Sequence, residues 1–191
     1  MISYSRYRRF KLALYKRLFR VLFSNSFGKY DTSVCIEKPD IIDGEKYIHI
    51  ESNVFIAKGC WLSAISTLYE DKTPYVHIDQ SVYIGRYFHL ASINKVEIGK
   101  GCMIGDNVLL TDHNHTNPID SKLRTAPLVS NGPVSIGSET WLGDKVVVIS
   151  STIGKGCIIA AGSVVTKDIP DYSIAAGVPA KVIKRIDGQT N

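Results

Sequence analysis

The sequence predicts an all-β protein built as a parallel β-helix, preceded by a basic amphipathic α-helix and closed by a short C-terminal segment. Aliphatic residues recur every six positions over most of the chain, and a small or β-branched residue follows four places after most of them. An α-helix repeats every 3.6 residues and a strand every 2, so neither gives a period of six. A coil with three short strands per turn gives this period directly.

The N-terminal segment, residues 1–30, differs from the rest in charge and pattern. Residues 4–23 contain no glycine or proline and predict one helix, followed by a linker over residues 24–31. Residues 1–25 carry seven basic and no acidic residues, whereas the remainder of the chain sums to −2. The excess charge is therefore local, and we expect no nucleic-acid partner.

The predicted helix has a basic face opposite a wide apolar face. Such a helix can lie on an anionic membrane surface, or pack on its own domain or a neighbouring subunit. No apolar stretch of about 18 residues is present, so no spanning helix is predicted. The segment also lacks the apolar core and cleavage site of a secretory signal.

The six-residue repeat begins at Ile50. Its aliphatic positions are 50, 56, 62 and 68, then 78, 84 and 90, then 98, 104 and 110, then 136, 142 and 148, and finally 153, 159 and 165. The residue directly after the aliphatic one is often glycine, and we interpret this glycine as permitting the backbone conformations of the corners. These glycines are Gly85, Gly99, Gly105, Gly137, Gly143 and Gly154.

Three of the four cysteines share a Lys-Gly-Cys context, at Cys60, Cys102 and Cys157. We expect them to be reduced and buried in equivalent slots of the repeat.

The repeat is interrupted in several places. Residues 69–77 predict an inserted surface loop, and the spacing between Leu90 and Ile98 is eight. A long polar segment occupies residues 111–133, and one residue is missing between Val148 and Ile153. We therefore divide the chain into residues 1–30, a β-helix domain over 31–186 with an inserted loop at 111–133, and a tail at 187–191.

The inserted loop opens with two histidines, His113 and His115. A neutral imidazole is a suitable general base near neutral pH, and either Asp112 or Asn114 could orient it. A zinc site formed with His77 or His89 is the less favoured alternative, and we expect no metal.

Three segments carry a resemblance to a known family. They read PVSIGSETWLG over 133–143, IGKGCIIAAGSVVTKDIP over 153–170 and AAGVPAKVI over 175–183. Together they resemble the hexapeptide-repeat acyltransferases, and more narrowly the maltose/galactoside O-acetyltransferase branch and the sugar O-acetyltransferases of polysaccharide synthesis. The resemblance covers roughly residues 50–185. It implies a left-handed β-helix, against the usual right-handed crossover, and a homotrimer that binds acetyl-CoA between adjacent subunits.

The resemblance also implies site residues. The family's catalytic histidine lies five residues after the last repeat aliphatic, which is Leu110 here, so it favours His115 over His113. Weak candidates for acceptor binding are Asp112, Asn114 and Asn94. The basic residues among the cofactor candidates could equally form a solvated face. The candidates for CoA binding are Trp141, Gly143, Asp144, Ala161, Gly162, Thr166, Lys167, Lys181 and Lys184.

We therefore expect an acetyl-CoA-dependent O-acetyltransferase that acetylates a sugar hydroxyl, in cell-surface polysaccharide biosynthesis, by direct transfer with a histidine base. Alternatives are acetylation of a free small molecule, such as an antibiotic, a disaccharide or a nucleotide-linked amino sugar, or a non-catalytic trimeric scaffold. The expected location is the cytoplasm, or the inner face of the cytoplasmic membrane through residues 4–23.

Overall fold

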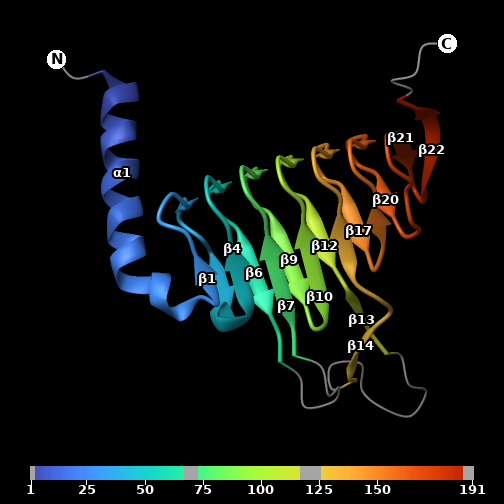
Figure 1. Ribbon diagram of the computed structural model, residues 1–191, viewed down its shortest axis with the longest axis horizontal. Helices are drawn as coiled ribbons and strands as arrows, with labels where there is room; N and C mark the ends of the chain where they lie inside the picture. The colour runs from blue at the N-terminus through green and yellow to red at the C-terminus, as the bar shows by residue number, and fades with distance from the viewer. Residues whose placement is uncertain (1–2, 67–72, 117–125, 187–191) are drawn as a thin grey trace.

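The computed structural model describes residues 3–66, 73–116 and 126–186 (Figure 1). One helix, α1 (Tyr4–Phe23), precedes a prism of stacked coils whose three faces are sheets A, B and C. Neighbouring strands in the prism are parallel until the last pair of sheet B.

The strands of sheet A are β1 (Lys29–Tyr30), β4 (Ile48–Ile50), β7 (Tyr75–Ile78), β10 (Lys95–Ile98), β15 (Val134–Ile136) and β18 (Thr152–Ile153). Those of sheet B are β2 (Cys35–Ile36), β5 (Phe55–Ile56), β8 (Tyr83–Ile84), β11 (Met103–Ile104), β16 (Trp141–Leu142), β19 (Ile158–Ile159), β21 (Ser173–Gly177) and β22 (Ala180–Arg185). Those of sheet C are β3 (Ile41–Asp43), β6 (Trp61–Ala64), β9 (His89–Ser92), β12 (Leu109–Thr111), β17 (Val147–Ile149) and β20 (Val164–Val165). Short 3₁₀ turns lie at Ser24–Ser26 and Glu45–Tyr47.

The repeat aliphatic residues fill the prism. Ile78, Ile84 and Leu90 of one coil lie in register with Ile98, Ile104 and Leu110 of the next, and all six are 0% exposed. Each such side chain contributes about 1.5–3 kcal/mol on burial, so the periodic positions form one continuous core. This confirms the predicted coil.

The role assigned to the glycines was wrong. The left-handed backbone conformation falls on the residue just before the small corner residue, as at Asn53, Ser81, Asn107 and Lys145. The glycines after the aliphatic residues are needed because the coils stack closely. A Cβ on Gly137 would lie 2.4 Å from the backbone nitrogen of Lys155, so any side chain there would force the two coils apart.

The prism begins earlier than expected. Strand β1 pairs with β4, so the first coil starts at Lys29, inside the predicted linker. Its inward positions Tyr30, Ile36 and Ile42 keep the six-residue spacing, but Gly44, with a φ of 73°, and the turn at Glu45–Tyr47 separate them from Ile50. At the predicted surface loop, residues 75–77 belong to strand β7 instead, and residues 67–72 lie outside the described part.

The four cysteines are free and buried, as predicted for the three in the Lys-Gly-Cys context. Cys102 and Cys157 precede strands of sheet B and Cys60 precedes a strand of sheet C, so they fill the same slot of the repeat at two different corners.

Both ends of the prism are covered. At the N-terminal end, Phe19 of α1 is buried and contacts Tyr15, Phe23 and Tyr30. At the C-terminal end, β22 folds back antiparallel on β21. Among the described residues, no helix is both long and apolar enough to cross a membrane.

Candidate active site

Asp112 is the centre of the candidate site, and its carboxylate is completely buried. It follows β12 and turns toward the corner between β9 and β10. There it accepts hydrogen bonds from the backbone N–H groups of Ile93 (2.9 Å), Asn94 (2.9 Å) and Lys95 (2.7 Å) and from Ser92 Oγ (2.6 Å). Burial raises the pKa of this carboxyl, but the hydrogen bonds from His113, Ser92 and the backbone outweigh it, and the pKa is lowered.

This corner explains the eight-residue spacing between Leu90 and Ile98. The two additional residues lengthen the connection between β9 and β10, and the lengthened corner supplies the N–H groups that hold Asp112. Because a buried carboxylate needs donors for its oxygens, the irregular spacing and Asp112 form one structural unit. The irregular spacing between Leu90 and Ile98 is visible in the sequence. Nothing in the repeat, however, connects this corner to Asp112, which lies 19 positions after Ile93 in the chain.

Asp112 holds the ring of His113. His113 Nδ1 lies 3.1 Å from Asp112 Oδ1, and the histidine side chain is 10% exposed. Because an ionised carboxylate only accepts hydrogen bonds, Nδ1 carries a proton, and in the neutral ring the lone pair is then on Nε2. That tautomer is the one that a general base requires.

His113 and His115 lie on one strand of a small antiparallel hairpin, β13 (His113–His115) with β14 (Leu128–Ser130). Residues two apart on a strand face the same side, so both histidines share a face and Asn114 lies on the other. His115 and Asn114 are exposed. Asn94 Nδ2 donates to Ser130 Oγ (3.2 Å) and ties the corner to the hairpin. The rest of the predicted loop, residues 117–125, lies outside the described part.

A third histidine lies beside this pair. His89 of β9 stacks on Trp61 with the ring centroids 4.7 Å apart. Its pKa is lowered, first by burial and then by the nearby His113. The sequence offered His89 only as a metal ligand. Among the described residues, no group of three or more His, Cys, Asp or Glu side chains is placed to hold a metal ion.

The predicted CoA residues gather at the C-terminal coils. Trp141 of β16 is 49% exposed on the outer face of sheet B. The register continues from Trp141 to Ile158, Ile174 and Lys184 across the four neighbouring strands β16, β19, β21 and β22. With strands about 4.8 Å apart, this row spans roughly 14 Å from an aromatic ring to a cation. The other exposed candidates are Ala161, Gly162, Thr166, Lys167 and Lys181.

Two of the cofactor candidates have structural contacts. Asp144 Oδ1 accepts a hydrogen bond from the backbone N–H of Asp106 (2.9 Å), so this carboxylate joins two coils. A Cβ on Gly143 would lie 2.7 Å from the nitrogen of Ala161, so this glycine is required by the stacking.

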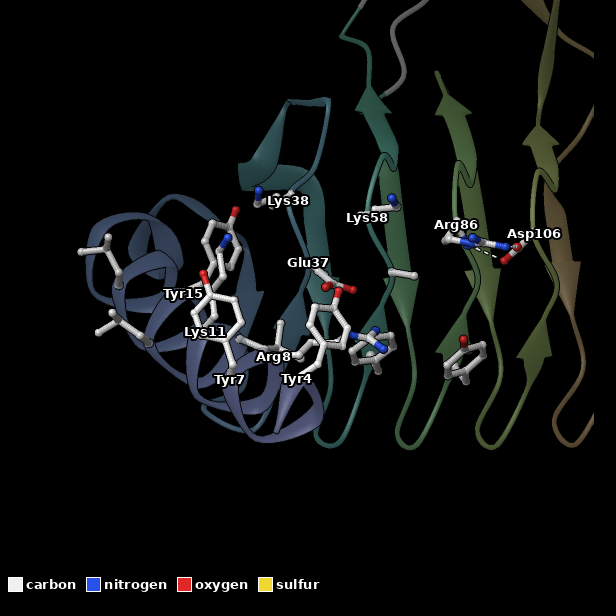
Figure 2. Close-up of a pocket in the computed structure, with 16 residues that line it drawn as sticks. Tyr4, Tyr7, Arg8, Lys11, Tyr15, Glu37, Lys38, Lys58, Arg86 and Asp106 are labelled. Carbon is white, nitrogen blue, oxygen red and sulfur yellow. Dashed lines mark hydrogen bonds and ion pairs between the residues drawn. The ribbon is translucent and has the colours of Figure 1, made fainter. Parts of the chain in front are cut away.

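Within one chain, the histidines and the cofactor row are separated. His113 follows a strand of sheet C, whereas Trp141 and Lys184 lie on sheet B. A cavity of about 1000 Å³ lies elsewhere again, between α1 and the first coils (Figure 2). It is lined by Tyr4, Tyr7 and Arg8 of the helix and by Phe55 and Tyr83 of sheet B, and no predicted site residue lines it.

Comparison with known proteins agrees with this architecture. Residues 133–167 match the family model of the bacterial transferase hexapeptide (six repeats). A protein of Escherichia coli (strain K12) named "Putative lipopolysaccharide biosynthesis O-acetyl transferase WbbJ" is 39% identical over 112 residues, 54% of this chain and 57% of that protein. The match thus spans little more than half of that relative.

Two solved structures share the fold. The N-acyltransferase AntD of Bacillus cereus, in complex with dTDP and 3-hydroxybutyryl-CoA, has a TM-score of 0.66 at 20% identity, covering 88% of each chain. Galactoside acetyltransferase in complex with coenzyme A has a TM-score of 0.52 at 25% identity, covering 90% of this chain and 81% of that one. The chain carries the bacterial transferase hexapeptide repeat, and the predicted left-handed β-helix and the resemblance to hexapeptide acetyltransferases are confirmed.

Proposed function

We propose that this hexapeptide-repeat protein is an acetyl-CoA-dependent O-acetyltransferase that acetylates a sugar hydroxyl in cell-surface polysaccharide synthesis. The observation that carries the proposal is the Asp112–His113 pair, whose 3.1 Å hydrogen bond fixes a base at the start of the β13–β14 hairpin. The name of the relative WbbJ supports the substrate class. Acetyl-CoA is the proposed donor, and support comes from the two structural neighbours, one in complex with 3-hydroxybutyryl-CoA and the other with coenzyme A.

In the proposed reaction, His113 Nε2 accepts the proton of the sugar hydroxyl as its oxygen attacks the thioester carbonyl. The C–S bond then breaks, and the protonated histidine returns its proton to the leaving thiolate. Asp112 stabilises the transient imidazolium through Nδ1. General-base catalysis supplies about 10²–10⁴-fold, and the alignment of the two substrates must supply the rest.

We assign this role to His113, although the family offset favours His115. A base is effective when a neighbour fixes its tautomer and ring orientation. Asp112 does this for His113 from a position that is itself held by four further hydrogen bonds. His115 is exposed on the same face of the hairpin and would contact the acceptor.

The coenzyme would lie along the row from Trp141 to Lys184 on sheet B. Trp141 would cover the thioester end, and Lys184 with Lys181 would bind phosphate groups as compact charges. Since His113 and this row lie on different faces of one chain, we propose a homotrimer in which the histidine of one subunit faces the row of its neighbour. Buried reduced cysteines suit a reaction in the cytoplasm.

The test is transfer of labelled acetyl groups from acetyl-CoA to a panel of oligosaccharides, nucleotide amino sugars and free disaccharides. We expect label on an oligosaccharide hydroxyl, with kcat/KM about 10²–10⁴-fold lower in His113→Ala and within about tenfold of wild type in His115→Ala. Trp141→Ala should weaken the rise in Tm that CoA produces, because binding only the folded state stabilises it.

Three results would overturn parts of the proposal. Label on the amine of a nucleotide sugar would show that the acceptor is a nucleotide-linked amino sugar and not a sugar hydroxyl. Full activity in His113→Ala with loss in His115→Ala would move the base to His115. A chain whose Tm does not respond to CoA would exclude the transferase and favour a non-catalytic scaffold.

A further inference from the structure

Helix α1 leaves an apolar stripe uncovered. The helix contacts the prism through Phe19, which is 6% exposed, while Lys16 Nζ donates to Ser33 O (2.5 Å) and Arg20 Nη1 to Thr32 O (3.1 Å). These contacts fix the rotation of the helix about its own axis. They leave the predicted apolar face exposed, with Tyr7, Leu14 and Leu18 along the open groove between the helix and the prism.

The exposed stripe runs almost the whole length of the helix. At 100° per residue, its members lie within one face, and they are Tyr7, Phe10, Leu14, Leu18, Val21 and Leu22. Each is between 53% and 71% exposed in a chain whose repeat aliphatics are fully buried. A contiguous exposed apolar patch of this kind marks an interaction surface.

The charges beside the stripe indicate what covers it. Arg6 and Arg17 lie along one edge, and Lys11 lies between Leu18 and Leu22 in the helical projection; all three cations are exposed. Residues 1–30 contain no acidic residue. A second copy of the stripe would bring these cations against one another, whereas an anionic lipid surface would pair with them.

The groove beneath the helix extends the same positive surface. Arg8 and Lys11 of α1 and Lys38 and Lys58 of the prism line it (Figure 2). The lining acids are Glu37 and Asp106, and Asp106 Oδ2 is bound by Arg86 Nη2 at 2.6 Å. The N-terminal end of the molecule is therefore basic around an apolar stripe.

We propose that α1 docks the protein onto the surface of a bilayer that contains anionic lipid, with the stripe inserted at the level of the headgroups. The prism holds the helix through Phe19, Lys16 and Arg20, none of which belongs to the stripe, so the stripe is exposed without rearrangement. The helix lies on the membrane and does not cross it. This inference is independent of the proposed reaction.

The test is co-sedimentation of the full chain with vesicles of phosphatidylcholine alone or of phosphatidylcholine with phosphatidylglycerol. We expect binding only to the anionic vesicles, with the bound fraction falling in high salt. Leu14→Glu and Leu18→Glu should lower the apparent affinity at least about tenfold. The matched control is Ala13→Glu, which makes the same charge change at an exposed position one residue away, off the stripe.

Equal losses in Leu14→Glu and Ala13→Glu would overturn the proposal in favour of charge attraction alone. Absence of binding to anionic vesicles by the wild-type chain would also overturn it. A lower mass of the Leu14→Glu assembly in light scattering, without vesicle binding by wild type, would assign the stripe to a second copy. None of these results depends on whether the chain transfers acetyl groups, which is measured separately on soluble acceptors.

Discussion

Two consecutive corners of one coil show how this protein separates stability from chemistry. At the corner between β11 and β12, the fully buried Val108 fills the prism, and Asn107, with a φ of 58°, makes the turn. At the next corner, the equally buried Asp112 leaves the repeat and bonds to the preceding coil. The first corner follows the six-residue period and stabilises the fold through apolar contacts. The second corner departs from the period and stabilises the fold through hydrogen bonds of Asp112, which also orients His113.

The difference predicts how each corner responds to truncation. Asp112→Ala would leave the N–H groups of residues 93–95 and Ser92 Oγ without their buried acceptor, at a cost of about 3–5 kcal/mol. Val108→Ala removes only apolar contact and should cost roughly 1–3 kcal/mol. Denaturant unfolding of the two variants measures the difference. An Asp112→Ala chain as stable as Val108→Ala would mean that water replaces the carboxylate at little cost.

The stacking of the regular coils gives the second prediction. Gly137→Ala would place a methyl group 2.4 Å from the nitrogen of Lys155, so the coils must separate and the free energy of unfolding should fall by about 1–3 kcal/mol. Lys145→Gly is the comparison, because Lys145 already adopts a left-handed φ of 59°. Glycine there relieves backbone strain but increases the entropy of the unfolded chain, so the change should stay within about 1 kcal/mol.

Thermal unfolding of both variants separates the two roles of glycine in this fold. A tolerated Gly137→Ala would show that the coils are more compliant than their spacing suggests. A strongly destabilised Lys145→Gly would show that the side chain of Lys145 contributes more than its backbone conformation costs.

What the sequence could predict follows from the range of the forces involved. The prism was predictable because each rung repeats the same local choice, an aliphatic residue inward and a small residue at the corner. The first coil was not predicted, because Gly44 and the turn at Glu45–Tyr47 shift Ile42 out of phase with Ile50. A search for residues spaced by six does not detect a coil that an inserted turn separates from the rest of the repeat.

The candidate site was predictable only in part. The polar break marked the two histidines, but the partner of His113 depends on N–H groups 17–19 positions earlier than Asp112 in the chain, which no local pattern links to it. The exposed stripe of α1 depends in the same way on contacts of Lys16 and Arg20 with the first coil. The sequence defined both faces of that helix, and only the docked position decides which of them is exposed.

The smallest predicted effect concerns the charge of Asp112 itself. Its pKa is lowered in the folded protein, so the stabilisation from its ionised form is complete above the ordinary carboxyl value of about 3.9 and is lost as the pH falls through the folded value. Asp112→Asn removes that titration. The difference in Tm between wild type and Asp112→Asn should therefore be constant from pH 7 to about pH 5 and shrink below about pH 4. Asn114→Ala, at an exposed and uncharged hairpin position, should show a difference that stays flat over the same range. A difference for Asp112→Asn that is equally flat would mean that the buried group is protonated in the folded state, and His113 would then lack the anion that fixes its tautomer.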